Sequence, residues 1–301
     1  MQKFALRMFM LLAVACVPCF AHPASNDNTV SEVPFAFEKG YVIVQVRIKG
    51  DVPVDVILST GAEHSILDSG LLEKYKLPSY YTGVGIVTGR NDTIVVYSTV
   101  ADIRVGDIKL SSLNMRLSAF SEISKKLGRE IFGTLGADFF KGRVAQFDFA
   151  KKVVRFLPQS LADTLKDKKA ANDAAVHVVL PMIFYNEIVT LPVVENVTFD
   201  GKKIKTLFDT GTVTVLALSS SATKQLGLTP PPEKGASRAD KIRLLRFDNY
   251  EITDVPATLY PKGSNFDRDN KEFGAVVGTI LLQNFVVTFD FRNKLITLEH
   301  I

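Results

Sequence analysis

The chain has 301 residues, of which 47% are hydrophobic and 23% charged, a composition typical of globular and not of disordered proteins. Its 36 basic and 32 acidic residues give a formal net charge of +4 without a basic run, so we expect no nucleic-acid partner. The length is enough for one large domain or for two lobes with their own cores.

Residues 1–21 have the pattern of a signal peptide, because Lys3 and Arg7 precede an apolar run that ends in small residues. This run is too short to span a bilayer, and no later apolar stretch reaches about 18 residues. A lipoprotein signal with Cys16 as the acylated residue and a retained anchor are the alternatives. Both cysteines of the chain lie in this segment, so the mature chain has no expected disulfide. The protein is expected to be exported, as a periplasmic or secreted form that is soluble or lipid-anchored.

Short β-branched and apolar runs, separated by turn residues, fill the next part of the chain and predict strands. We expect these strands at residues 41–48, 52–58, 83–88, 93–100, 103–105, 108–110, 114–117, 144–148 and 153–157, with a short helix at 71–76. Together they predict a mainly β lobe over residues 33–158.

Residues 159–175 are polar and charged and have no apolar periodicity, which predicts a linker. The strand pattern then restarts and predicts a second β lobe over residues 176–301. We expect its strands at residues 175–181, 188–193, 204–208, 241–246, 255–260, 275–278, 286–290 and 295–299, with a helix capped by Ser219.

Three segments of the first lobe recur in the second lobe in the same order. The matched pairs are Ser59-Thr60-Gly61 with Asp209-Thr210-Gly211, Leu135-Gly136 with Val277-Gly278, and residues 147–153 with residues 289–295. This repeat predicts an internal duplication of a unit of about 125 residues, and therefore two lobes related by a pseudo-twofold axis.

Each matched tripeptide follows an apolar strand and can direct a polar side chain out of a tight loop. Asp209 places a carboxylate at such a strand end, where its burial requires hydrogen-bond partners. The threonine of each tripeptide supplies a hydroxyl, and the glycine permits a tight turn. We therefore expect Thr60, Gly61, Thr210 and Gly211 to support a pair of catalytic loops.

These motifs resemble those of the aspartic peptidases, the pepsin and retropepsin superfamily, and most of all its bacterial retropepsin-like branch. The resemblance covers residues 33–158 and 176–301. It implies two β-barrel lobes that face each other across a cleft, with one catalytic aspartate from each lobe and an extended peptide or protein segment as the ligand. Gly136 and Gly278 resemble the glycine that crosses behind each catalytic loop.

The resemblance also implies a flap over the cleft. The hairpin at residues 83–100 is the candidate, with peptide contacts expected from Gly85, Val87, Thr88 and Gly89. An ordinary solvent-exposed hairpin is the alternative.

The chain departs from the family where Ser59 replaces the first catalytic aspartate. The family's chemistry needs two carboxyl groups that share a proton, one to activate water and one to polarise the peptide carbonyl. Ser59 cannot be the second carboxyl group, although its hydroxyl can hydrogen-bond a water or Asp209. Asp55 and Asp68 lie near in sequence, but neither is expected to point at Asp209.

Three functions remain open on the sequence. The first is a peptidase homologue with lost or reduced activity that binds peptide. The second is an active aspartic endopeptidase that uses Asp209 with a water held by Ser59, or with an aspartate from a second chain. The third is a structural envelope protein.

A serine hydrolase built on Ser59 and His64 is disfavoured, because the chain has no Gly-x-Ser-x-Gly elbow. The four histidines lack metal-ligand spacing, so we expect no metal and no cofactor. We expect a monomer or a weak dimer.

Overall fold

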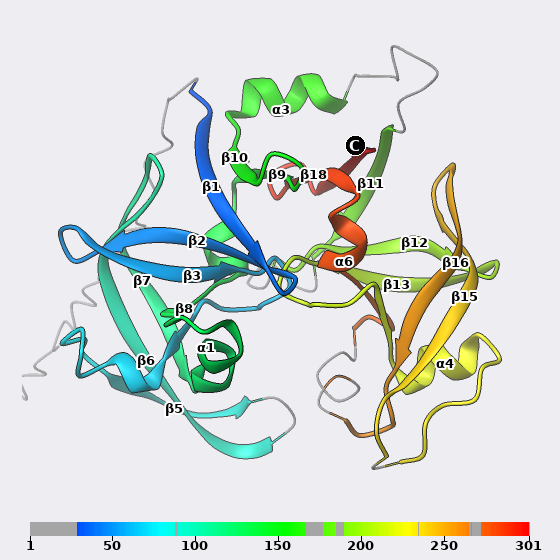
Figure 1. Cartoon of the computed structure of the whole chain (residues 1–301), viewed down its shortest axis with the longest axis horizontal. Coiled ribbons are helices and arrows are strands. Elements are labelled where there is room, and N and C mark those ends of the chain that lie inside the picture. The colour runs from blue at the N-terminus through cyan, green and yellow to red at the C-terminus, as the bar shows by residue number, and fades with distance from the viewer. Residues whose placement is uncertain are drawn as a thin grey trace, which may run out of the picture.

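Figure 1 shows the computed structural model of the chain. It describes residues 29–87, 90–166, 177–184, 190–233, 235–264, 266 and 272–300. The described elements are mainly β-strands, as predicted, and they form two lobes joined by a shared sheet (Figure 1). Among these residues, no helix is long and apolar enough to cross a membrane.

The first lobe is a closed ring of six strand pairings. In ring order the strands are β2 (Tyr41–Ile48), β3 (Val52–Leu58), β8 (Gly133–Leu135), β4 (Ile66–Asp68), β7 (Ile108–Ser118) and β6 (Arg90–Val105), which returns to β2. The barrel core is apolar, since the inward side chains of β2 and β3 are buried Val, Ile and Leu.

The second lobe has a ring with the same pairing order. Its strands are β12 (Val193–Phe199), β13 (Lys202–Asp209), β17 (Ala275–Gly278), β14 (Leu216–Leu218), β16 (Tyr250–Leu259) and β15 (Arg238–Phe247), which returns to β12. The parallel pairs also correspond, because β3–β8 matches β13–β17 and β4–β7 matches β14–β16.

A central antiparallel sheet joins the two lobes. Its strands are, in order, β1 (Ser31–Glu38), β10 (Val153–Phe156), β9 (Val144–Asp148), β18 (Phe285–Asp290), β19 (Leu295–His300) and β11 (His177–Ile183). The last two strands predicted in each half form a hairpin, and the structure pairs the two hairpins with each other through β9 and β18. Phe147 and Phe289 meet edge to face across this junction, with ring centroids 5.8 Å apart.

The remaining elements are short. They are β5 (Tyr80–Val87), the 3-10 turn η1 (Ser69–Leu71), α1 (Ser121–Leu127), α2 (Ala137–Phe140), α3 (Gln159–Lys166), α4 (Ser220–Gln225) and α6 (Thr279–Leu282). The prediction of a helix at residues 71–76 is wrong, because the chain forms the 3-10 turn η1 a few residues earlier. There the Asp68 side chain accepts a hydrogen bond from Gly70 N and caps the turn. Helix α3 occupies the first part of the segment predicted as a linker.

Candidate active site

The two matched tripeptides lie together where their lobes meet. β3 ends at Leu58 and β13 ends at Asp209. Near these ends, each strand pairs in parallel with a short strand, β3 with β8 and β13 with β17. Ser59 N donates to Leu135 O at 3.0 Å, so the first loop turns away at the end of its barrel strand. The same geometry in both barrels brings Ser59 and Asp209 face to face.

The threonines of the two loops form reciprocal hydrogen bonds with each other. Thr60 N donates to Thr210 Oγ1 at 3.1 Å, and Thr210 N donates to Thr60 Oγ1 at 3.1 Å. The Thr60 hydroxyl donates to Phe208 O at 2.8 Å, and the Thr210 hydroxyl donates to Leu58 O at 3.0 Å. Both threonines are fully buried, so these four bonds hold the lobes in register without competition from water.

The glycines of the two loops allow close approach across the lobe boundary. A Cβ atom on Gly61 would lie 2.4 Å from Asp209 Cγ, and one on Gly211 would lie 2.2 Å from Ser59 Oγ. No larger residue fits either position without a shift of the opposite loop. Each glycine is therefore required by the residue that faces it from the other lobe.

The Asp209 carboxylate is the hydrogen-bonding centre of the site. Its Oδ1 accepts from the Ser59 hydroxyl at 2.9 Å, from Gly61 N at 2.9 Å and from Gly211 N at 2.6 Å. Its Oδ2 accepts from the Thr212 hydroxyl at 2.5 Å. Ser59 and Asp209 are only 6% and 7% exposed, which makes these bonds strong.

The hydroxyl of Ser59 cannot take the place of a protonated carboxyl group. Its single proton is donated to Asp209, and its oxygen accepts from Ala62 N at 3.1 Å. No proton therefore remains at Ser59 to polarise a peptide carbonyl. Among the described residues, Asp209 supplies the one carboxylate that takes part in the hydrogen bonds of the two loops.

The two nearby carboxylates that could replace it are held elsewhere. Asp55 accepts from Arg129 Nε at 2.9 Å, and Asp68 accepts from Gly70 N at 3.0 Å. Neither side chain hydrogen-bonds a residue of the two matched tripeptides in the described part of the chain.

Gly136 and Gly278 lie directly behind the loops, at matching places in the two barrels. A Cβ atom on Gly136 would lie 2.7 Å from Ala62 O, and one on Gly278 would lie 2.4 Å from Thr212 O. Backbone bonds close the same contacts, since Ala137 N donates to Ala62 O at 2.8 Å. The two glycines therefore fix the backbone that follows each tripeptide.

The flap candidate forms the hairpin of β5 and β6. Its pairing runs from Tyr80 opposite Tyr97 to Val87 opposite Arg90, and Gly85 lies opposite Thr93. β6 thus begins at Arg90, three residues before the strand expected at residues 93–100. Two of the expected contact residues, Thr88 and Gly89, lie outside the described residues.

The sequence did not single out Thr212 and Tyr97, and it considered His64 only for a serine hydrolase; the structure places all three at or beside the site. The Thr212 hydroxyl donates a hydrogen bond to Asp209. Its position three residues after the aspartate is typical of a side chain that closes a turn, and this spacing is the signal in the sequence that could have identified it. His64 follows the first loop and packs its ring edge against Tyr97 at the base of the flap, with centroids 6.4 Å apart. These contacts connect both loops to their surroundings.

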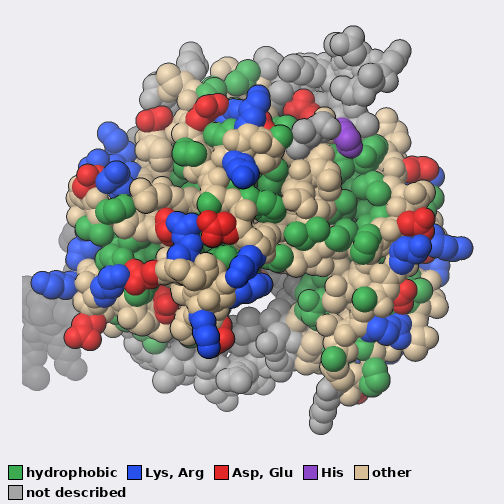
Figure 2. Space-filling view, viewed as in Figure 1, with side chains coloured by type: hydrophobic (Ala, Val, Ile, Leu, Met, Phe, Trp, Pro, Cys, Tyr) green, Lys and Arg blue, Asp and Glu red, His purple; other side chains and the backbone are tan. Residues whose placement is uncertain are grey.

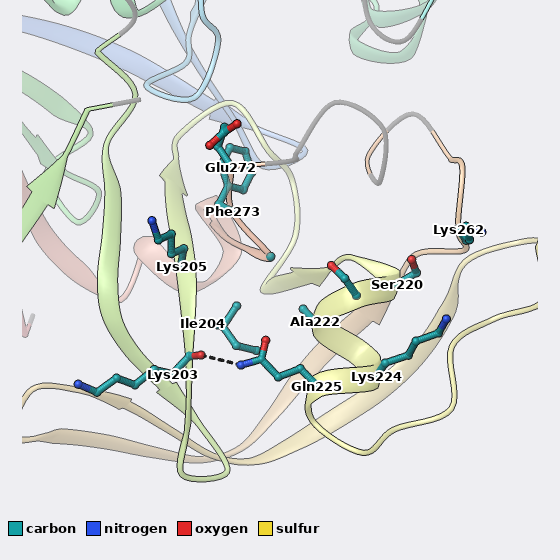
Figure 3. Close-up of a pocket in the computed structure, with 12 residues that line it drawn as sticks. Lys203, Ile204, Lys205, Ser220, Ala222, Lys224, Gln225, Lys262, Glu272 and Phe273 are labelled. Atoms are coloured by element: carbon teal, nitrogen blue, oxygen red, sulfur yellow. Dashed lines mark hydrogen bonds between the residues drawn. The ribbon is translucent and has the colours of Figure 1, made fainter. Parts of the chain in front are cut away.

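A separate hollow of about 650 Å³ lies in the second lobe, away from both loops. It is bounded by β13 and α4, and the ammonium groups of Lys203 and Lys224 point to opposite sides of it (Figure 3). Its positive charges do not converge on one point, so it is not a focused anion site. No group of residues that could hold a metal ion occurs in the described part of the chain.

Comparison with known proteins agrees with this geometry. Residues 44–139 match the model of the aspartyl protease family. The match supports an aspartic-peptidase-like fold for the first lobe. The matched segment contains the Ser59 loop and Gly136, whereas the Asp209 loop lies outside it.

Among solved structures, the chain is similar to the crystal structure of basic 7S globulin from soybean. The two share 9% sequence identity at a TM-score of 0.49, over 90% of this chain and 95% of that chain. No curated protein matches the chain.

Proposed function

We propose that this protein is an exported aspartic-peptidase homologue that binds an extended peptide between its lobes and does not hydrolyse it. The observation that carries the proposal is the hydrogen bond that the Ser59 hydroxyl donates to Asp209. Ser59 occupies the position at which the family has a second carboxyl group.

Peptide binding is supported by how completely the rest of the site is built. The reciprocal threonine bonds, the two facing glycines and the two glycines behind the loops are all present. The molecular surface is hollowed between the two lobes (Figure 2). An extended segment in such a hollow can pair its backbone with a hairpin edge, as in other strand-addition complexes. The shared pairing order of the barrels also supports an origin by internal duplication.

The active-peptidase alternatives receive no support from the contacts at the site. Ser59 could accept a hydrogen bond from a water, but it could not donate one to the peptide carbonyl, because its hydroxyl proton is already donated to Asp209. An aspartate from a second chain would have to approach Asp209 at Oδ2, because Oδ1 already accepts three hydrogen bonds.

Export belongs to the same proposal. The signal segment at residues 1–21 lies outside the described residues, and its processing decides between a cleaved soluble form and a form lipidated at Cys16. The intact mass of the protein purified from its host separates the two, because acylation adds the mass of the lipid.

The proposal is tested with a fluorescently labelled peptide library, by measuring binding and cleavage in the same samples. We expect saturable binding without new peptide termini. Cleavage that increases in acid and disappears in Asp209→Asn would establish an active peptidase instead. Absence of both binding and cleavage would favour the structural role.

A further inference from the structure

Among the described residues, the buried carboxylate of Asp209 has no cationic partner. Its four hydrogen-bond donors are neutral, being the hydroxyls of Ser59 and Thr212 and the backbone N–H groups of Gly61 and Gly211. No lysine, arginine or histidine of the described residues forms an ion pair with it. Buried charges in proteins are usually paired with an opposite charge or a metal, so this carboxylate lacks a partner that a ligand can supply.

The hydrogen bonds already made show which atoms are still open to a ligand. Each carboxylate oxygen offers about two lone-pair directions. Oδ1 of Asp209 has three donors and is saturated, whereas Oδ2 accepts only from Thr212 among the described residues. The Ser59 oxygen gives its proton to Asp209, accepts from Ala62 N and keeps one lone pair. The atoms that remain open are therefore acceptors only.

We propose that Asp209 Oδ2 binds the ammonium group of a lysine side chain in the bound peptide, with Ser59 Oγ, which lies 2.9 Å from Oδ1 of the same carboxylate, as a second acceptor. This inference rests on the proposed function, because it assigns the residue class at the centre of the peptide. An ammonium has three N–H donors and no acceptor, which matches a site that offers acceptors and a negative charge. A peptide carbonyl would instead meet acceptors alone.

The number of acceptor atoms that remain open on Asp209 and Ser59 favours lysine over arginine and over a metal ion as the ligand. A guanidinium binds a carboxylate best through two parallel bonds, one to each oxygen. Oδ1 is already saturated, so this fork cannot form on Asp209. One carboxylate oxygen and one hydroxyl are also too few ligands for a hard cation such as Ca²⁺.

The test uses the full chain and mixtures of acetylated, amidated octapeptides. Each mixture fixes one position as lysine, arginine or norleucine and randomises the others, and its affinity is measured by competition. We expect one position at which lysine binds roughly 10- to 100-fold tighter than norleucine, the range for a charge-assisted hydrogen bond, with a smaller gain for arginine. The wild-type chain alone gives this result, so it does not depend on a variant that folds.

Two variants locate the preference. Asp209→Asn removes the charge and should abolish the preference for lysine, whereas Ser59→Ala keeps the charge and should retain most of it. Saturable binding with equal affinity for lysine and norleucine would overturn the inference and leave the proposed function standing. A lysine preference that survives in a folded Asp209→Asn variant would also overturn it. If no mixture binds, the proposed function fails and the inference fails with it.

Discussion

The reciprocal threonine bonds make a specific prediction about what holds the two lobes in register. We consider Thr60→Val, which keeps the β-branched shape and removes only the hydroxyl. The substitution deprives Thr210 N of its acceptor and Phe208 O of a donor, at distances of 3.1 and 2.8 Å in the native structure. Thr60 and Thr210 are fully buried, so water cannot replace the lost partner without opening the lobe boundary.

The size of the effect follows from those two groups. Each buried polar group left without a partner costs about 1–3 kcal/mol, so Thr60→Val should lower the free energy of unfolding by about 2–6 kcal/mol. The matched control is Thr223→Val, at an equally buried threonine in α4. There the hydroxyl donates to Ser219 O, which also accepts from Thr223 N at 2.9 Å. That carbonyl stays paired, so the control should cost no more than about 1 kcal/mol.

Urea unfolding followed by circular dichroism measures both variants against the wild type. We expect the midpoint of Thr60→Val to fall well below that of Thr223→Val, with similar slopes. Equal losses in the two variants would refute the reasoning, because the inter-lobe bonds would then be worth no more than a single redundant helix bond.

Two further substitutions probe the site and the surface. Gly211→Ala should lower the free energy of unfolding by about 1–3 kcal/mol because its Cβ would collide with Ser59, whereas Gly70→Ala, whose Cβ would meet only an atom 3.5 Å away, should cost much less in the same unfolding assay. A hydrogen bond from Lys74 lowers the pKa of Glu130 below its ordinary value near 4.5. Glu130 therefore stabilises the fold above that pH and loses this contribution as the pH falls through its lowered pKa. The unfolding midpoints of wild type and Glu130→Gln should differ slightly at pH 7 and converge below about pH 4, and a difference that grows in acid would contradict this assignment.

The sequence predicted the mainly β fold and the pair of loops because both depend on local patterns. A strand followed by a small polar tripeptide with glycine third is visible within seven residues, and its recurrence placed Ser59 opposite Asp209. The positions of Gly136 and Gly278 were also accessible, since each ends an apolar run. The glycines' contacts with the loop backbones agree with that reading.

Other features depend on contacts that no local pattern contains. The pairing of β9 with β18 joins residues about 140 positions apart, and each strand alone reads as part of its own hairpin. The sequence predicts two short strands, at residues 108–110 and 114–117, where the structure has the single strand β7. Ser111 and Ser112 interrupt the apolar pattern, yet both are exposed residues within β7 and Ser112 pairs with Ala101 of β6. The direction in which Ser59 donates its proton depends on where Ala62 N lies, which only the folded loop determines.

The central claim is that the site is intact except for one carboxyl group. The most direct test compares the wild type with Ser59→Asp on one peptide library at acidic and neutral pH, with new peptide termini identified by mass spectrometry. We expect no cleavage by the wild type and acid-dependent cleavage by Ser59→Asp, because the substitution restores a second carboxyl group beside Asp209. Acid-dependent cleavage by the wild type that is lost in Asp209→Asn would contradict the account.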